Sequence, residues 1–120
     1  MKKGSINKLE AAKKLEALIN GLESLIVDHA NWDNGLLSIY LTKALYRLYM
    51  AKTCLLRDLY DSFELDMQQA VIHVSESLEY YSDATGNGQE EIEKFFFDAV
   101  YPIIEFKNET MDSINKSVKI

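Results

Sequence analysis

The stretch ALYRLYMAKTCLLRDLY, residues 44–60, decides the fold, because apolar side chains recur in it at helical spacing on two faces. One stripe begins just before the stretch and consists of leucines interrupted by a lysine at position 52: Leu41, Leu45, Leu48, Leu55 and Leu59. The other stripe is largely aromatic: Tyr46, Tyr49, Leu56, Tyr60 and Phe63. A helix in a four-helix bundle needs only one apolar stripe to face the core. The second stripe therefore needs a separate explanation.

Two interpretations of the aromatic stripe are open. In the first, the helix is central in the bundle, and tyrosines at its margins bury their rings while their hydroxyls stay in water. In the second, the stripe lies outside the core and binds another protein, since Tyr, Met and Arg are enriched at interfaces. Both arginines of the chain lie in this stretch. The second interpretation predicts a partner-binding surface made of Tyr46, Arg47, Tyr49, Arg57 and Tyr60.

Helical spacing dominates the rest of the chain, and no segment alternates in the manner of a strand, which predicts the all-α fold class. A first helix is expected to start with Ser5 as its N-cap and to end near His29. The second should begin at residue 35 or 36, the third should end in the Gly-rich segment 82–89, and the fourth should start near residue 89 or 90. Four helices with short polar connections predict an antiparallel four-helix bundle in a single domain, residues 1–120.

Two helix boundaries require an argument. No Gly or Pro interrupts residues 36–81, yet one helix of that length would measure about 70 Å, which is out of scale with a compact domain. Asp61 and Glu64 fit a capping box, which places a break near residues 60–62. Pro102 has no N–H group, so the last helix is expected to be kinked or split near this residue.

Composition predicts one globular domain: 48% of the residues are hydrophobic and 27% are charged. No apolar run approaches the roughly 20 residues that cross a bilayer, so no membrane span is expected. The amino-terminal residues do not read as a signal peptide, and the lone Cys54 cannot form an internal disulfide. These features favour a cytoplasmic protein.

Charge is divided unevenly along the chain. The net charge is −6, and residues 61–93 hold nine acids and no Lys or Arg. Such a block repels phosphate backbones, so direct binding of nucleic acid is not expected. It forms either a solvated surface that keeps the domain in solution or a surface that binds a basic site on another protein. The acidic face is expected to contain Asp61, Glu64, Asp66, Glu76 and Glu79.

Catalysis would require converging polar groups, and the sequence offers few. His73 and Glu76 share a helix face and resemble half of a carboxylate–histidine metal motif, but the second half is absent. Cys54 has no histidine at helical spacing that would activate it as a nucleophile. We therefore expect a non-enzyme with no cofactor and no metal. A metal protein or enzyme that uses His73 and Glu76 is the least favoured alternative.

The function predicted from these features is a small cytoplasmic protein–protein interaction module, an adaptor or regulator. It is expected to form a homodimer, the commonest symmetric assembly, and to bind a protein partner through the aromatic helix face. The alternative is an acidic inhibitor, such as an immunity, antitoxin-like or phage counter-defence protein. Such an inhibitor would block a basic surface of a nucleic-acid enzyme with the acidic face.

Overall fold

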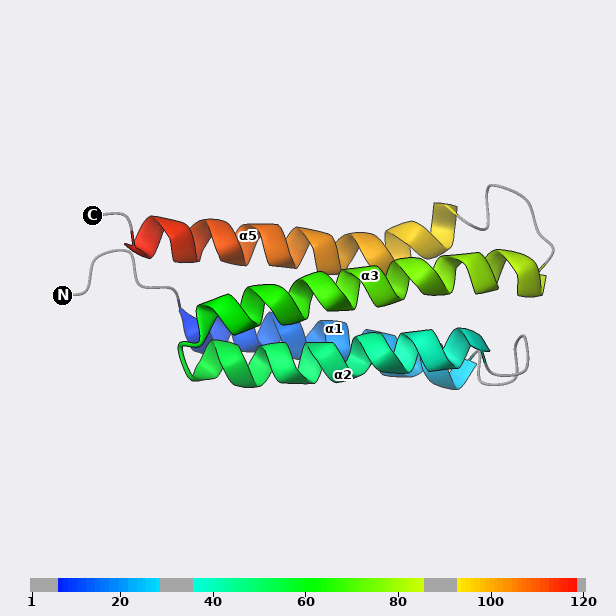
Figure 1. The fold of residues 1–120 in the computed structure, drawn as a ribbon, viewed down its shortest axis with the longest axis horizontal. Helices are drawn as coiled ribbons and strands as arrows, with labels where there is room; N and C mark the ends of the chain where they lie inside the picture. Colours follow the sequence, from blue (N-terminus) through cyan, green and yellow to red (C-terminus); the bar gives the residue numbers. More distant parts are fainter. Residues whose placement is uncertain (1–6, 29–35, 86–92, 119–120) are drawn as a thin grey trace.

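The computed structural model describes residues 7–28, 36–85 and 93–118, which form helices and no strand. The elements are α1 (Lys8–Asp28), α2 (Leu36–Leu56), α3 (Tyr60–Thr85), the π-helical turn η2 (Phe96–Val100) and α5 (Tyr101–Val118). They lie side by side in an elongated bundle with extents of 54 × 23 × 19 Å (Figure 1). The residue colours run from left to right along α1 and α3, and from right to left along α2 and α5. The predicted all-α bundle is confirmed.

The core contains one fully buried stripe from α2 at strict heptad spacing: Leu37, Leu41, Ala44, Leu48, Ala51 and Leu55. These residues pack between α1 and α3, the two neighbours of α2. Side chains from α3 complete the centre: Phe63, Met67, Ala70 and Val74. The leucine stripe predicted from the sequence therefore lies in the core at three of its positions, whereas Leu59 is exposed.

The turn between α2 and α3 lies at residues 57–59, and the capping box predicted at Asp61 is wrong, because Asp61 is already within the first turn of α3. Asp58 adopts a left-handed conformation with φ of 62°. The N–H of Leu59 donates to the carbonyl oxygen of Cys54 at 2.8 Å, and the N–H of Asp58 donates to that of Leu55 at 3.3 Å. This pair of bonds is a Schellman motif, in which aspartate takes the position that glycine usually occupies.

Helix α1 begins one residue after its N-cap, Asn7, whose side-chain oxygen accepts a hydrogen bond from the N–H of Glu10 at 3.1 Å. The predicted cap, Ser5, lies outside the described residues, as do the predicted first residues of the fourth helix. Helix α3 ends at Thr85, immediately before the glycine-containing segment that was expected to stop it. Within the described ranges, no helix has the length and apolar character that a membrane crossing requires.

The last helix changes its hydrogen-bonding pattern just before Pro102. The N–H of Tyr101 donates to the carbonyl oxygen of Phe96, five residues back, which is the pattern of a π-helix. Residues 93–95 are helical before this turn, and α5 continues after it. The predicted disturbance therefore takes the form of a π-helical turn, and a kink of the axis stays a prediction.

Candidate functional site

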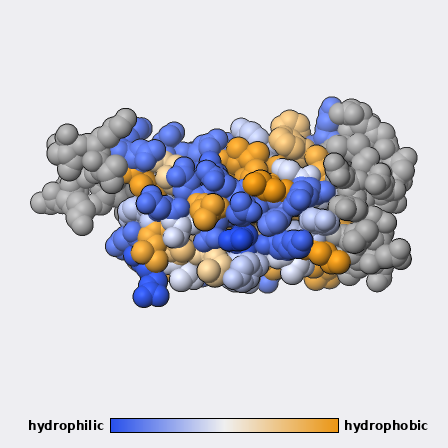
Figure 2. Space-filling model, in the orientation of Figure 1, coloured by the Kyte–Doolittle hydropathy of each residue, from blue (hydrophilic) through white to orange (hydrophobic). Residues whose placement is uncertain are grey.

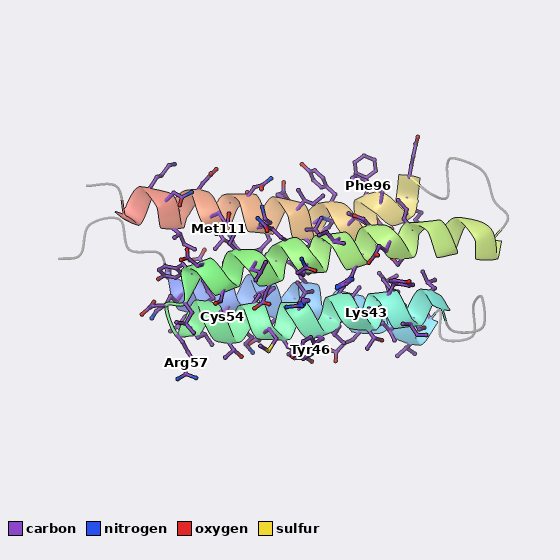
Figure 3. All side chains as sticks on the ribbon, viewed as in Figure 1. Lys43, Tyr46, Cys54, Arg57, Phe96 and Met111 are labelled. Carbon is purple, nitrogen blue, oxygen red and sulfur yellow. The ribbon has the colours of Figure 1, made fainter. Side chains whose placement is uncertain are left out.

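Helix α2 exposes large side chains on the side opposite its core stripe. Tyr46 and Tyr49 are 59% and 46% exposed, and Tyr46 and Arg57 point away from the bundle (Figure 3). We call this surface the outer face of α2 and define it by the exposed large apolar residues of the helix: Ile39, Tyr46, Tyr49, Met50 and Leu56. Ile39 and Met50 were not predicted to belong to this surface, although their spacing of seven and four residues from Tyr46 places all three on one helical face.

The aromatic stripe predicted from the sequence is not one surface. Phe63 is fully buried and meets Phe106 edge to face, with ring centroids 6.3 Å apart. Tyr60 is half-buried, and its hydroxyl donates to Asp58 Oδ1 at 2.8 Å. The prediction failed here because α2 ends at Leu56, and residues beyond the turn belong to a helix with another axis.

The two arginines of the predicted surface have different surroundings. The guanidinium of Arg47 donates to Asp66 Oδ1 at 3.0 Å, across the seam between α2 and α3. The thiol of Cys54 donates to the other carboxylate oxygen, Oδ2, at 3.6 Å. Arg57, by contrast, is exposed at the end of α2. Arg47 therefore holds two helices together, and Arg57 is the arginine that a partner can reach.

Cys54 is buried next to a negative charge, and both conditions oppose its ionisation. Burial raises the pKa of the Cys54 thiol, and the charge and hydrogen bond of Asp66 raise it further. The thiol therefore stays protonated at neutral pH, where it acts as a hydrogen-bond donor to Asp66. This chemistry suits a structural cysteine and not a nucleophile.

One edge of the outer face is fastened to α1. The hydroxyl of Tyr49 donates to Glu23 Oε2 at 3.0 Å, and this hydrogen bond is the main cause that raises the pKa of Tyr49. Lys52, which interrupts the leucine stripe, forms an ion pair with Glu16 Oε1 at 2.8 Å. These contacts orient α2 so that Tyr46 stays on its solvent side.

Exposed cations lie beside the outer face of α2 within an acidic protein, with Glu23 of α1 at the edge that contacts Tyr49. Helix α2 contains no acidic residue, and the exposed cations Lys43 and Arg57 flank its apolar side chains. The ammonium of Lys43 lies 4.8 Å from the centre of the Tyr40 ring, a cation–π arrangement. Figure 2 shows separate hydrophobic patches among hydrophilic residues on the side that α2 and α3 present.

The predicted acidic face is smaller than expected. Asp66 is only 6% exposed and is paired with Arg47, so its assignment to this face is wrong. Asp61 is exposed, Glu64 is half-buried, and Glu79 lies on α3 with a side chain outside the described set. Glu76 is exposed and contacts His73 Nδ1 at 2.9 Å.

The arrangement of the outer face offers rings, a thioether and cations for association with another molecule. No cluster of three or more potential metal ligands occurs among the described residues. No family model matches the chain, and comparisons with curated proteins and with solved structures likewise found no match.

Proposed function

We propose that the chain is a protein–protein interaction module whose partner-binding surface is the outer face of α2. The observation that supports this is the exposure of five large apolar side chains on a helix whose core stripe is already fully buried. Burying one such side chain stabilises a complex or a fold by about 1.5–3 kcal/mol. The five side chains are 39–59% exposed, so the monomer forgoes only about half of this energy at each position, and a partner that covers them would recover that part.

The charge of the surface defines the partner. Lys43 and Arg57 flank the apolar side chains, α2 itself contains no acid, and Glu23 of α1 lies only at the edge where it accepts the Tyr49 hydrogen bond. An amphipathic helix with acidic residues beside its apolar stripe complements this surface in both respects. Helices bind such a surface through anchors spaced three, four or seven residues apart, and the exposed residues Ile39, Tyr46 and Met50 of α2 are themselves seven and four residues apart.

A second copy of the chain offers a helix of this kind. Helix α3 exposes Leu65 and Ile72, together with the acids Asp61 and Glu76. In a two-fold dimer, α2 of each copy would pack against α3 of the other, so that both contacts join a basic surface to an acidic one. The proposed homodimer therefore covers the outer face of α2 in both copies, each with α3 of the other copy.

The mass of the purified protein in solution, measured by light scattering across protein concentrations, tests the homodimer. Tyr46→Ala combined with Met50→Ala should weaken association by roughly 2 kcal/mol or more, about 30-fold. The matched control is Leu9→Ala, because Leu9 is exposed on α1 outside the proposed surface. A wild-type monomer at tens of micromolar would refute the homodimer, and a dimer indifferent to both α2 substitutions would refute the use of this face.

If the chain is monomeric, the same variants test a different protein partner. The wild-type chain and the chain with both Tyr46→Ala and Met50→Ala serve as matched baits in affinity capture. The proposal requires a protein that the wild-type chain captures and the doubly substituted chain does not. The acidic-inhibitor alternative has less support, because Asp66 is occupied by Arg47. Steep loss of partner binding with added salt, unchanged by the α2 substitutions, would favour that alternative.

A further inference from the structure

A groove separates α1 from η2 and the start of α5, on a different flank of α1 from the one that contacts Tyr49 and Lys52. The groove encloses about 260 Å³. Its walls are mostly apolar, with leucines from α1 on one side and isoleucine and alanine from the last helix on the other: Leu18, Leu22, Leu25, Ala99 and Ile103. This volume is slightly below the range of roughly 300–1,000 Å³ found for small-molecule sites, so only a small ligand would fit.

The groove stays open because small residues line it. A Cβ atom added at Gly21 would meet no atom within 4 Å, so the space above this residue is empty. The groove is open to solvent, because Ala17, Gly21 and Asp98 on its lining are exposed, and an apolar group that enters it would release water from its apolar walls. The walls therefore suit an alkyl or aromatic group.

The π-helical turn gives the same groove a polar end. In an α-helix the N–H of Tyr101 would donate to the carbonyl of Phe97, and residue 102 would donate to the carbonyl of Asp98. Here Tyr101 donates to Phe96 instead, and Pro102 has no N–H. The carbonyl oxygen of Asp98 thus loses its α-helical donor, and Asp98 and Pro102 both line the groove. Turns of this kind occur frequently at functional sites.

The carboxylate of Asp98 lies at this end of the groove. Asp98 is exposed and is the one charged residue among those that line the groove. Within the part of the chain that the structure describes, it forms no ion pair and no side-chain hydrogen bond. The groove therefore combines apolar walls with one carboxylate, which is a hydrogen-bond acceptor.

We propose that this groove binds a small alkylammonium ligand, independently of the partner-binding surface on α2. The alkyl chain lies along Leu18, Leu22 and Ile103, where it displaces water from the apolar walls. The ammonium group supplies three N–H donors and a positive charge, which match the Asp98 carboxylate. A ligand with a carboxylate head would instead place two negative charges side by side.

Titration of the full-length chain with octylammonium, octanoate and octanol tests this proposal, because the three probes share one alkyl chain and differ in charge. Binding is followed by calorimetry and by the amide chemical shifts of Ala17, Gly21 and Ala99. Octylammonium should saturate a single site, shift these amides, and bind at least about tenfold more tightly than octanoate. Equal affinity for the two charged probes, or shifts confined to other parts of the chain, would overturn the proposal.

Two variants separate the roles of charge and space. Asp98→Asn should weaken octylammonium binding about tenfold and leave octanol binding unchanged, whereas Asp112→Asn, an exposed acid elsewhere on α5, should change neither. Gly21→Leu should abolish binding of all three probes by filling the groove. Should Gly21→Leu fail to fold, Asp98→Asn still decides, because unchanged octylammonium affinity in that variant refutes the proposed head-group site.

Discussion

Replacing Asp66 with asparagine keeps the shape of this side chain and removes the negative charge that joins α2 to α3. Asp66 is 6% exposed, and it accepts bonds from Arg47 at 3.0 Å and from the Cys54 thiol at 3.6 Å. Breaking a fully buried ion pair costs about 3–5 kcal/mol. The side chain of Arg47 is 34% exposed, however, so water can solvate it after the change. A loss nearer to that of one hydrogen bond to a charged group, about 2 kcal/mol of unfolding free energy, is therefore expected.

Urea denaturation followed by circular dichroism measures this loss, at several protein concentrations so that association is separated from folding. Asp112→Asn is the control, because Asp112 is exposed and its replacement should change the unfolding free energy by no more than about 0.5 kcal/mol. Arg47→Met should cost more than Asp66→Asn, since it leaves a buried carboxylate that water cannot reach. The double variant Arg47→Met with Asp66→Leu should recover most of the stability lost in Arg47→Met alone, because well-packed apolar residues replace buried ion pairs with little penalty.

A change of less than about 0.5 kcal/mol in the unfolding free energy for both Asp66→Asn and Arg47→Met would contradict a stabilising ion pair. The same conclusion follows if the effects of Arg47→Met and Asp66→Leu, each measured alone, simply add in the double variant, since additivity would mean that the two residues do not interact. Either result would show that α2 and α3 are held by apolar packing alone.

Four further outcomes are expected. Phe63→Ala should lower the unfolding free energy by about 3–5 kcal/mol because the ring is fully buried. Tyr46→Ala should change the unfolding free energy of the monomer by only about 0.5 kcal/mol. Similar losses in the two variants would contradict the assignment of Phe63 to the core and Tyr46 to the surface. Modification of Cys54 by a thiol reagent at neutral pH should proceed no faster than unfolding, because the side chain is buried and a reagent cannot reach it, and burial also raises the thiol pKa; rapid reaction of the native protein would contradict this. Asp58→Ala should be less stable than Asp58→Gly by about 1 kcal/mol, measured by denaturation, since both lose the carboxylate but only alanine is strained at φ of 62°. Burial and the Asp58 hydrogen bond raise the pKa of Tyr60. The stability that this phenol contributes is therefore complete below its unfolded pKa of about 10 and is lost as the pH rises through its folded pKa. The unfolding free energy measured by denaturation above pH 10 should decline less in Tyr60→Phe than in the wild type, and an equal decline would refute this.

The helical fold could be predicted because its signal is local and repeated. The leucines at positions 41, 48 and 55 recur every seven residues and are all buried. The aromatic positions could not be assigned in the same way, because helical spacing shows which residues share a face and not which face meets a neighbour. Tyr46 is exposed and Phe63 is buried, and that difference depends on where α2 ends.

The turn between α2 and α3 was misplaced because two patterns competed. Asp61 and Glu64 satisfy the spacing of a capping box, but Asp58 adopts the left-handed conformation that ends α2 three residues earlier. Aspartate tolerates this conformation better than most residues, so it gives a weaker signal than glycine. The burial of Asp66 did have a signal, since this residue lies three positions after Phe63 and four before Ala70 on the core stripe of α3.

The two proposed surfaces can be tested independently because α1 separates them. One flank of α1 holds the edge of the outer face of α2 through Glu16 and Glu23. Another flank lines the groove through Leu18 and Leu25. Distant substitutions that share no partner usually have additive effects. Gly21→Leu should therefore leave association through α2 unchanged, and a strong effect of this variant on association would show that α1 couples the groove to the outer face.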